Sequence, residues 1–195
     1  MGNRKIVKML VQIAVLSLGP LLAGLTLALL AGPLPAQAAA GTARPNAALE
    51  SSADYTRTVY LPIVRGAPAP EEQLADLINA ERSRRGLSEL RASPVLMQVA
   101  EAHSQDMVNR NFFDHTNPDG QDPGDRLDEA GYAWSSWGET IGGGYTTPQA
   151  MFTGWMNSPG HQDIILEPGF TEIGIGHVTG GHYGYYWTAD FATPQ

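Results

Sequence analysis

Cysteine is absent from the 195-residue chain. Without a thiol the chain cannot form a disulfide scaffold, a cysteine-ligated zinc or iron–sulfur site, a thiol nucleophile or a lipoprotein anchor on cysteine. Lysine is absent beyond residue 8, which excludes a Schiff-base lysine and a Ser-Lys dyad. Residues 41–195 carry nine arginines against twenty acidic side chains, a net charge of −11. This acidic segment offers no basic stripe to a phosphate backbone, so we expect no nucleic-acid partner.

A single long hydrophobic run lies near the N-terminus. Basic residues at positions 4–8 precede the uncharged stretch 9–30, and Ala36-Gln37-Ala38 follows it. This order is typical of a signal peptide with its cleavage site, although a run of this length also suits an uncleaved anchor. We predict a signal peptide or N-terminal anchor over 1–40 and a secreted or extracellular protein. Membrane contact is then expected only through an uncleaved N-terminal segment.

The remainder divides into a linker and one folded domain. Residues 41–68 are rich in Ala, Ser, Thr and Pro, a composition typical of linkers. The apolar patch 58–64 within them reads equally well as a docking strand or as an exposed piece of tail. We predict the folded domain over 69–195.

Helical patterns come first in this domain and strand patterns last. Apolar residues recur with the helical period, between proline starts and glycine stops, over 70–85, 93–107, 123–130 and 148–156. Two β-rich segments, 172–178 and 185–191, flank a Gly180-Gly181 turn. Helices followed by antiparallel strands predict an α+β fold.

Ordered motifs run along the whole domain: Ala102-His103-Ser104, Phe113-x-His115, Pro118-Asp119-Gly120, Gly138-Glu139-Thr140-Ile141, Trp155-Met156-Asn157-Ser158-Pro159-Gly160-His161 and Phe170-Thr171-Glu172-Ile173-Gly174-Ile175-Gly176. In this order they resemble the bacterial branch of the CAP superfamily, also called the SCP or PR-1-like domain. The resemblance covers residues 71–193. It implies an α-β-α sandwich with a short antiparallel sheet between helical layers.

Plant and animal members of that family carry two histidines and two glutamates in a cleft. Position by position, His115 matches the first histidine and Glu139 the first glutamate. Ser158 stands where the second glutamate is expected, and 185–188 contain no histidine. His161, in a segment typical of the bacterial branch, is the remaining candidate, so the resemblance implies a triad rather than a tetrad.

Two imidazoles and a carboxylate form a plausible three-ligand site with an open position for water. We therefore predict His115, Glu139 and His161 as ligands of a divalent metal, with Zn²⁺ best suited. Alternatively, Glu139 orients a histidine for general acid–base work. Neither Ser104 nor Ser158 has an activating context, so water on a metal is the main hydrolytic route left.

Other residues have competing structural readings. His103 shares the apolar helix face of Ala100 and Met107 and is expected in the core or at the edge of the cleft, whereas His177 and His182 are expected to be structural or exposed. Three aromatics flank Glu139, which raises the hypothesis of a groove wall for an apolar or glycan ligand. They are Trp134, Trp137 and Tyr145.

Three function classes remain at this point. The sequence favours a secreted, non-enzymatic binding or interaction module with a His/Glu cleft able to hold a metal. Its expected partner is an extracellular lipid, a cell-wall component or a protein. The alternatives are a metal-assisted hydrolase of peptide or cell-wall bonds, in which the catalytic residues would be His115, Glu139 and His161, and a stable scaffold with a vestigial cleft.

Overall fold

The computed structural model describes residues 67–195. The predicted signal or anchor over 1–40 and the apolar patch 58–64 lie outside the described residues, as does all but the end of the predicted linker. Within residues 67–195, no helix has the length and apolarity needed to cross a membrane.

Five helices and four strands make up this part of the chain. In order they are α1 (Pro70–Arg84), β1 (Arg91–Ala92), α2 (Pro94–Arg110), α3 (Pro123–Glu129), β2 (Trp134–Gly143), α4 (Pro148–Met156), α5 (Pro159–Ile165), β3 (Glu172–Gly180) and β4 (Gly184–Pro194). Each helix begins with proline, whose missing N–H costs nothing in a first turn. The four predicted helices and the two predicted strands are confirmed. The strands β1 and β2 and the helix α5 are additions.

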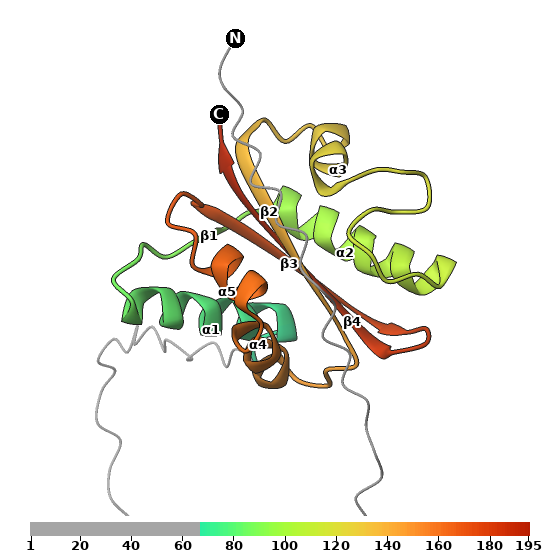
Figure 1. Cartoon of the computed structure of the whole chain (residues 1–195), viewed down its shortest axis with the longest axis horizontal. Helices are drawn as coiled ribbons and strands as arrows, with labels where there is room; N and C mark the ends of the chain where they lie inside the picture. Colours follow the sequence, from blue (N-terminus) through green and yellow to red (C-terminus); the bar gives the residue numbers. More distant parts are fainter. Residues whose placement is uncertain (1–66) are drawn as a thin grey trace, which may run out of the picture. The chain divides into compact units, whose positions relative to one another are not determined.

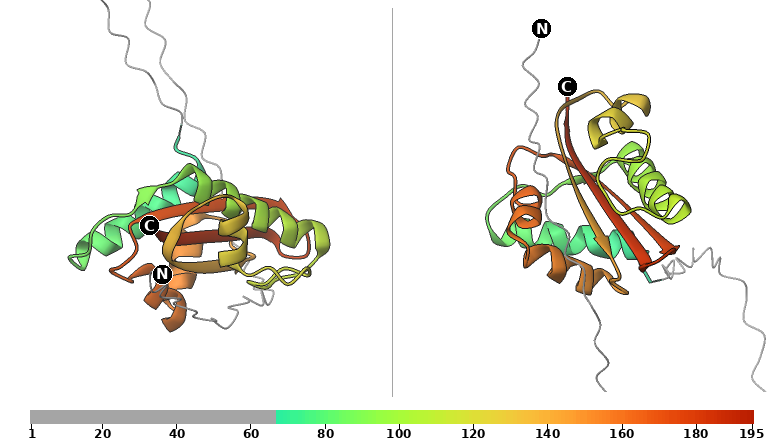
Figure 2. Two further views of the ribbon diagram at one scale, coloured as in Figure 1. Left: turned by 90° about the horizontal axis from the view of Figure 1, so that it is seen from above. Right: turned by 45° about the vertical axis from the view of Figure 1, so that its right-hand side comes forward.

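The fold is α+β, with a sheet between two helical layers (Figures 1 and 2). The strand order is β1-β3-β4-β2. The β3–β4 and β2–β4 pairs are antiparallel, while the short β1 pairs in parallel with β3. The sheet is therefore mixed rather than wholly antiparallel. Helices α2 and α3 lie on one side of it, and α1, α4 and α5 lie on the other (Figure 1).

Glycines in β3 let α2 pack directly on the sheet. A Cβ atom on Gly174 would come within 2.1 Å of the backbone of Leu96 and Met97, and one on Gly176 within 2.2 Å of the backbone nitrogen of Glu101. The alternating isoleucines of the same strand point to the opposite face, where Ile173 and Ile175 join the larger core cluster. The Ile-Gly-Ile-Gly motif thus serves two different layers of the sandwich.

The aromatic groove-wall hypothesis is wrong for the two tryptophans. Trp134 and Trp137 are only 5% and 6% exposed and belong to a core cluster, whereas Tyr145, at 6% exposed, also lines a surface pocket beside α4. Trp134 and Trp137 pack edge to face with their ring centroids 6.4 Å apart. The Gly- and Ser-rich sequence around them is explained by β2, which buries both of its faces because helices cover both sides of the sheet.

Candidate functional site

Glu139 is a buried carboxylate in the middle of the sheet. It lies on β2 opposite Asp190 of β4, and its residue is 3% exposed. Paired residues of antiparallel strands point to the same face, so both carboxyl groups face α2 together with Gly174, the β3 partner of Asp190. A carboxylate buried in this way must be held by donors or it would take up a proton.

Two donors hold Glu139, one on each oxygen. His115 Nδ1 lies 2.6 Å from Oε1, and Arg126 Nη2 donates to Oε2 at 2.5 Å. Burial by itself would raise the pKa of Glu139, but the neighbouring His103, Arg126 and His115 lower it to about 2. Glu139 is therefore ionised at neutral pH, with both oxygens engaged.

His115 comes from the loop between α2 and α3. Arg126 Nη1 donates to its backbone oxygen at 2.8 Å, so one guanidinium fixes both the histidine backbone and Glu139. Because Nδ1 faces the Glu139 carboxylate, Nε2 is the ring nitrogen left for another partner. That nitrogen is buried and has no hydrogen-bond partner within residues 67–195.

His161 approaches from the other helical layer, in the first turn of α5. It is 2% exposed, and its Nδ1 is buried without a hydrogen-bond partner in the described part of the chain. Burial, and then the charge on His115, lower the pKa of His161 to about 4. The fold therefore brings these two histidines within electrostatic reach, and His161 is neutral at pH 7.

The three predicted metal ligands are not equivalent in the structure. No three His, Asp or Glu side chains between residues 67 and 195 lie close enough to share a metal ion. Glu139 has no free oxygen, since it accepts from both His115 and Arg126. Its geometry suits a residue that orients a histidine. Metal binding by His115, Glu139 and His161 stays a prediction.

Sequence reasoning missed two members of this cluster. Arg126 stands in the short helix α3, which begins with a capping box formed by Asp122 and Asp125, and its partner Glu139 lies 13 residues away in the sequence. Asp190 did leave a signal, an acid between the apolar Ala189 and Phe191. Burial and then the nearby Glu139 carboxylate raise the pKa of Asp190 well above its ordinary value.

The other candidates are held by contacts within the fold. His103 is buried as expected, and its Nε2 lies 3.0 Å from the Asp114 carbonyl oxygen. His177 stacks on Trp187 at 3.9 Å, and His182 is exposed, both as expected. The hydroxyl of Ser104 is within 2.8 Å of the hydroxyl of Thr188 and is fully buried.

The family model for the Cysteine-rich secretory protein family (CAP) matches residues 75–191, more than half of the chain. The chain belongs to the CAP family. This CAP domain has no cysteine, so no disulfide contributes to its stability.

Bacterial proteins are among its relatives. The uncharacterized protein YkwD of Bacillus subtilis is 41% identical over 123 residues, which cover 63% of this chain and 47% of YkwD. The uncharacterized membrane protein YlbC of the same organism is 35% identical over 106 residues, which cover 54% of this chain and 31% of YlbC. The CAP domain chain thus spans less than half the length of either curated relative.

Solved structures share its fold. An extracellular protein containing a SCP domain from Bacillus anthracis is 33% identical, with a TM-score of 0.57, covering 63% of this chain and 40% of that one. An outer surface protein from Borrelia burgdorferi matches with a TM-score of 0.60, and the match covers 66% of this chain and 97% of the Borrelia chain. At 18% identity the second match supports the fold of the CAP domain alone.

Proposed function

We propose that this CAP domain is a secreted, non-enzymatic binding module whose His115–Glu139 site receives the ligand. The observation that carries the proposal is the bare Nε2 of His115, buried without a partner in the described residues while Glu139 fixes the other side of the ring. Holding an imidazole nitrogen in one orientation favours ligand binding.

A divalent metal is the first ligand to test. The donors that fit are the two unpartnered imidazole nitrogens, Nε2 of His115 and Nδ1 of His161. Glu139 fits as the carboxylate that orients His115 and raises its basicity rather than as a third ligand. A bound Zn²⁺ would supply Lewis acidity to a water or to a partner's carbonyl group.

Burial of the acidic groups favours binding over catalysis. Glu139 and Asp190 are 3% and 1% exposed, so neither carboxyl group can reach a substrate in solution. Ser104, the serine nearest His103 in sequence, is engaged by Thr188. Neither these two carboxyl groups nor Ser104 is therefore placed to act as a nucleophile.

Secretion is part of the proposal. It is supported by the basic and apolar pattern of residues 1–40 and by the extracellular SCP-domain protein of B. anthracis at 33% identity. An extracellular lipid, cell-wall component or protein is the expected biological partner.

Calorimetric zinc titration of the full chain tests the site. We expect one-to-one binding that is lost in the His115→Ala/His161→Ala double variant. Glu139→Gln should weaken binding about 10- to 100-fold, the usual effect of removing an orienting carboxylate. His182→Ala, an exposed histidine, is the matched control and should bind as the wild type does.

Two results would contradict the proposal. Zinc binding that is unchanged in the double variant would place the metal elsewhere on the acidic surface. Hydrolysis of peptide or cell-wall substrates that requires both zinc and His115 would favour the metal-assisted hydrolase instead.

A further inference from the structure

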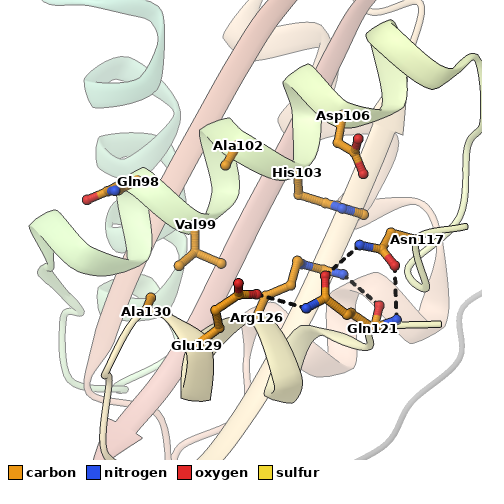
Figure 3. A pocket seen from close by; sticks show the side chains of 10 residues that line it. All are labelled: Gln98, Val99, Ala102, His103, Asp106, Asn117, Gln121, Arg126, Glu129 and Ala130. Carbon is orange, nitrogen blue, oxygen red and sulfur yellow. Dashed lines mark hydrogen bonds between the residues drawn. The ribbon is translucent and has the colours of Figure 1, made fainter. Parts of the chain in front are cut away.

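A second site lies between α2 and α3. A pocket of about 450 Å³ opens there, lined by one face of α2, the loop before α3 and the outer residues of α3 (Figure 3). This volume is within the range of small-molecule sites. Neither His115 nor His161 lines it, so the pocket goes beyond the site proposed above.

The wall of the pocket is held rigidly by its own hydrogen bonds. Asn117 accepts from the backbone nitrogens of Asp119 and Gln121 at 3.1 and 2.9 Å, and its amide donates to Gln121 Oε1 at 2.8 Å. Gln121 in turn donates to Glu129 Oε2 of α3 at 2.8 Å. A wall fixed in this way loses little conformational entropy when a ligand binds.

Two buried nitrogen atoms of the lining lack partners. His103, whose side chain is 0% exposed, has its Nε2 at the Asp114 carbonyl and leaves Nδ1 without a hydrogen bond among the described residues. Nε of Arg126 is in the same condition. Both side chains extend toward Asn117 and Gln121 from opposite helices (Figure 3). Buried polar atoms of this kind need a partner.

The chemistry of the two atoms specifies that partner. Nε2 of His103 faces the Asp114 carbonyl oxygen, which can only accept, so Nε2 carries the hydrogen and Nδ1 is the acceptor of the ring. Nε of Arg126 is a donor. A hydroxyl group satisfies both because it donates and accepts, whereas a carboxylate cannot donate and an ammonium cannot accept.

The charges and the apolar side chains of the lining limit the chemical class of the ligand further. Asp106 is paired with Arg110, and Arg126 with Glu139, so these charges of the lining are already compensated within the described chain and favour a neutral ligand. The small apolar side chains of Val99, Ala102 and Ala130 leave room for the C–H groups of a ligand. We propose that the α2–α3 pocket binds a neutral carbohydrate, either a free sugar or one unit of a glycan chain.

Chemical-shift titration of the full chain with a matched sugar series tests this. Glucose and N-acetylglucosamine are neutral, glucuronate carries a negative charge and glucosamine a positive one. Saturable shifts at Gln98, Gln121 and Glu129 are expected with the neutral sugars, and at least tenfold weaker ones with the two charged sugars. If the β-1,4-linked trimer of N-acetylglucosamine binds at least tenfold more tightly than the monomer, the ligand of the pocket is a glycan chain. If trimer and monomer bind with equal affinity, the ligand is a free sugar.

Ala102→Leu fills the pocket from an exposed helical position that tolerates leucine. We expect it to weaken sugar binding at least tenfold. Ala80→Leu, at an exposed position of α1, is the matched control and should leave binding unchanged.

Failures of the two proposals are distinguishable. His115→Ala should abolish zinc binding yet leave sugar affinity within a factor of two, and Ala102→Leu should do the reverse. The carbohydrate proposal is overturned if no neutral sugar binds, if Ala102→Leu binds as the wild type does, or if an uncharged Ala-Ser-Ala peptide with blocked ends binds in the pocket and the sugars do not.

Discussion

Arg82 supplies a sharp stability test of the fold. It lies in the last turn of α1 with 0% of its surface exposed, and no carboxylate is recorded as its partner in the described chain. Its guanidinium instead donates to four backbone carbonyls: Ser88 at 3.0 Å, Ile165 at 2.8 Å, Glu167 at 3.0 Å and Phe170 at 3.4 Å. It thereby ties α1 to the turn that follows it and to the segment that ends α5.

Arg82→Met keeps the length of the side chain and removes every donor. Hydrogen bonds from a charged group contribute about 1.5–3 kcal/mol each, and the four losses are not additive because they share one guanidinium group. We therefore expect the free energy of unfolding to fall by about 4 kcal/mol. Arg82→Lys should recover about half of this, since an ammonium cannot span carbonyls on two segments as the guanidinium fork does.

Urea unfolding followed by tryptophan fluorescence measures the loss, because all four tryptophans are buried. Arg84→Met is the matched control. Its side chain is 67% exposed and pairs only with Glu81 in the described chain, so the change should lie within about 0.5 kcal/mol. A loss below about 1 kcal/mol in Arg82→Met, with an unchanged m-value, would refute this account of how α1 is joined to the segment that follows α5.

Three further predictions concern packing and buried charge. Gly174→Ala should cost about 3 kcal/mol or more in urea unfolding, because its Cβ would lie 2.1 Å from helix backbone, while Gly169→Ala, which is exposed, should be nearly neutral. Asp190→Asn should be more stable than the wild type at pH 7. Burial and Glu139 raise the folded-state pKa of Asp190 above 3.8. The free energy of unfolding of the wild type should therefore fall by up to about 1.4 kcal/mol for each pH unit above 3.8, until the folded-state pKa is reached. Equal pH dependence of unfolding in the wild type and Asp190→Asn would exclude this. Burial lowers the pKa of His161 from 6.5 to about 4. As the pH falls from 6.5 to 4, the free energy of unfolding of the metal-free wild type should therefore drop by up to about 3 kcal/mol relative to His161→Asn. A difference in unfolding free energy that stays constant over this range would contradict the prediction.

The helices and the β3–β4 hairpin could be predicted because their signals are local. Proline starts and a 3.6-residue apolar period mark α1 and α2, and Gly180-Gly181 marks the turn of the hairpin. The strand β2 escaped because both of its faces are buried. Trp134 and Trp137 therefore read as loop aromatics rather than as an alternating strand.

The site was only partly predictable for a related reason. His115 and Glu139 were found through motif order, and the structure joins them at 2.6 Å. Arg126 and Asp190 carry no motif, since what makes them important is a partner across the fold: Glu139 Oε2 for the arginine and the neighbouring strand for the aspartate. Contacts of this kind are set by tertiary packing, which a pattern in one segment does not encode.

The shared guanidinium of Arg126 couples the two proposed sites. Its Nη2 holds Glu139, which orients His115, while its Nε is the donor left for a sugar hydroxyl. A hydroxyl that binds Nε is expected to shift the planar group that also holds Glu139, the partner of His115. Linkage then requires reciprocity: the factor by which N-acetylglucosamine changes zinc affinity must equal the factor by which zinc changes sugar affinity. Zinc titrations with and without saturating sugar, and sugar titrations with and without zinc, measure the two factors. Factors that both equal one would show that Arg126 does not move when the pocket fills, and that the two sites act independently.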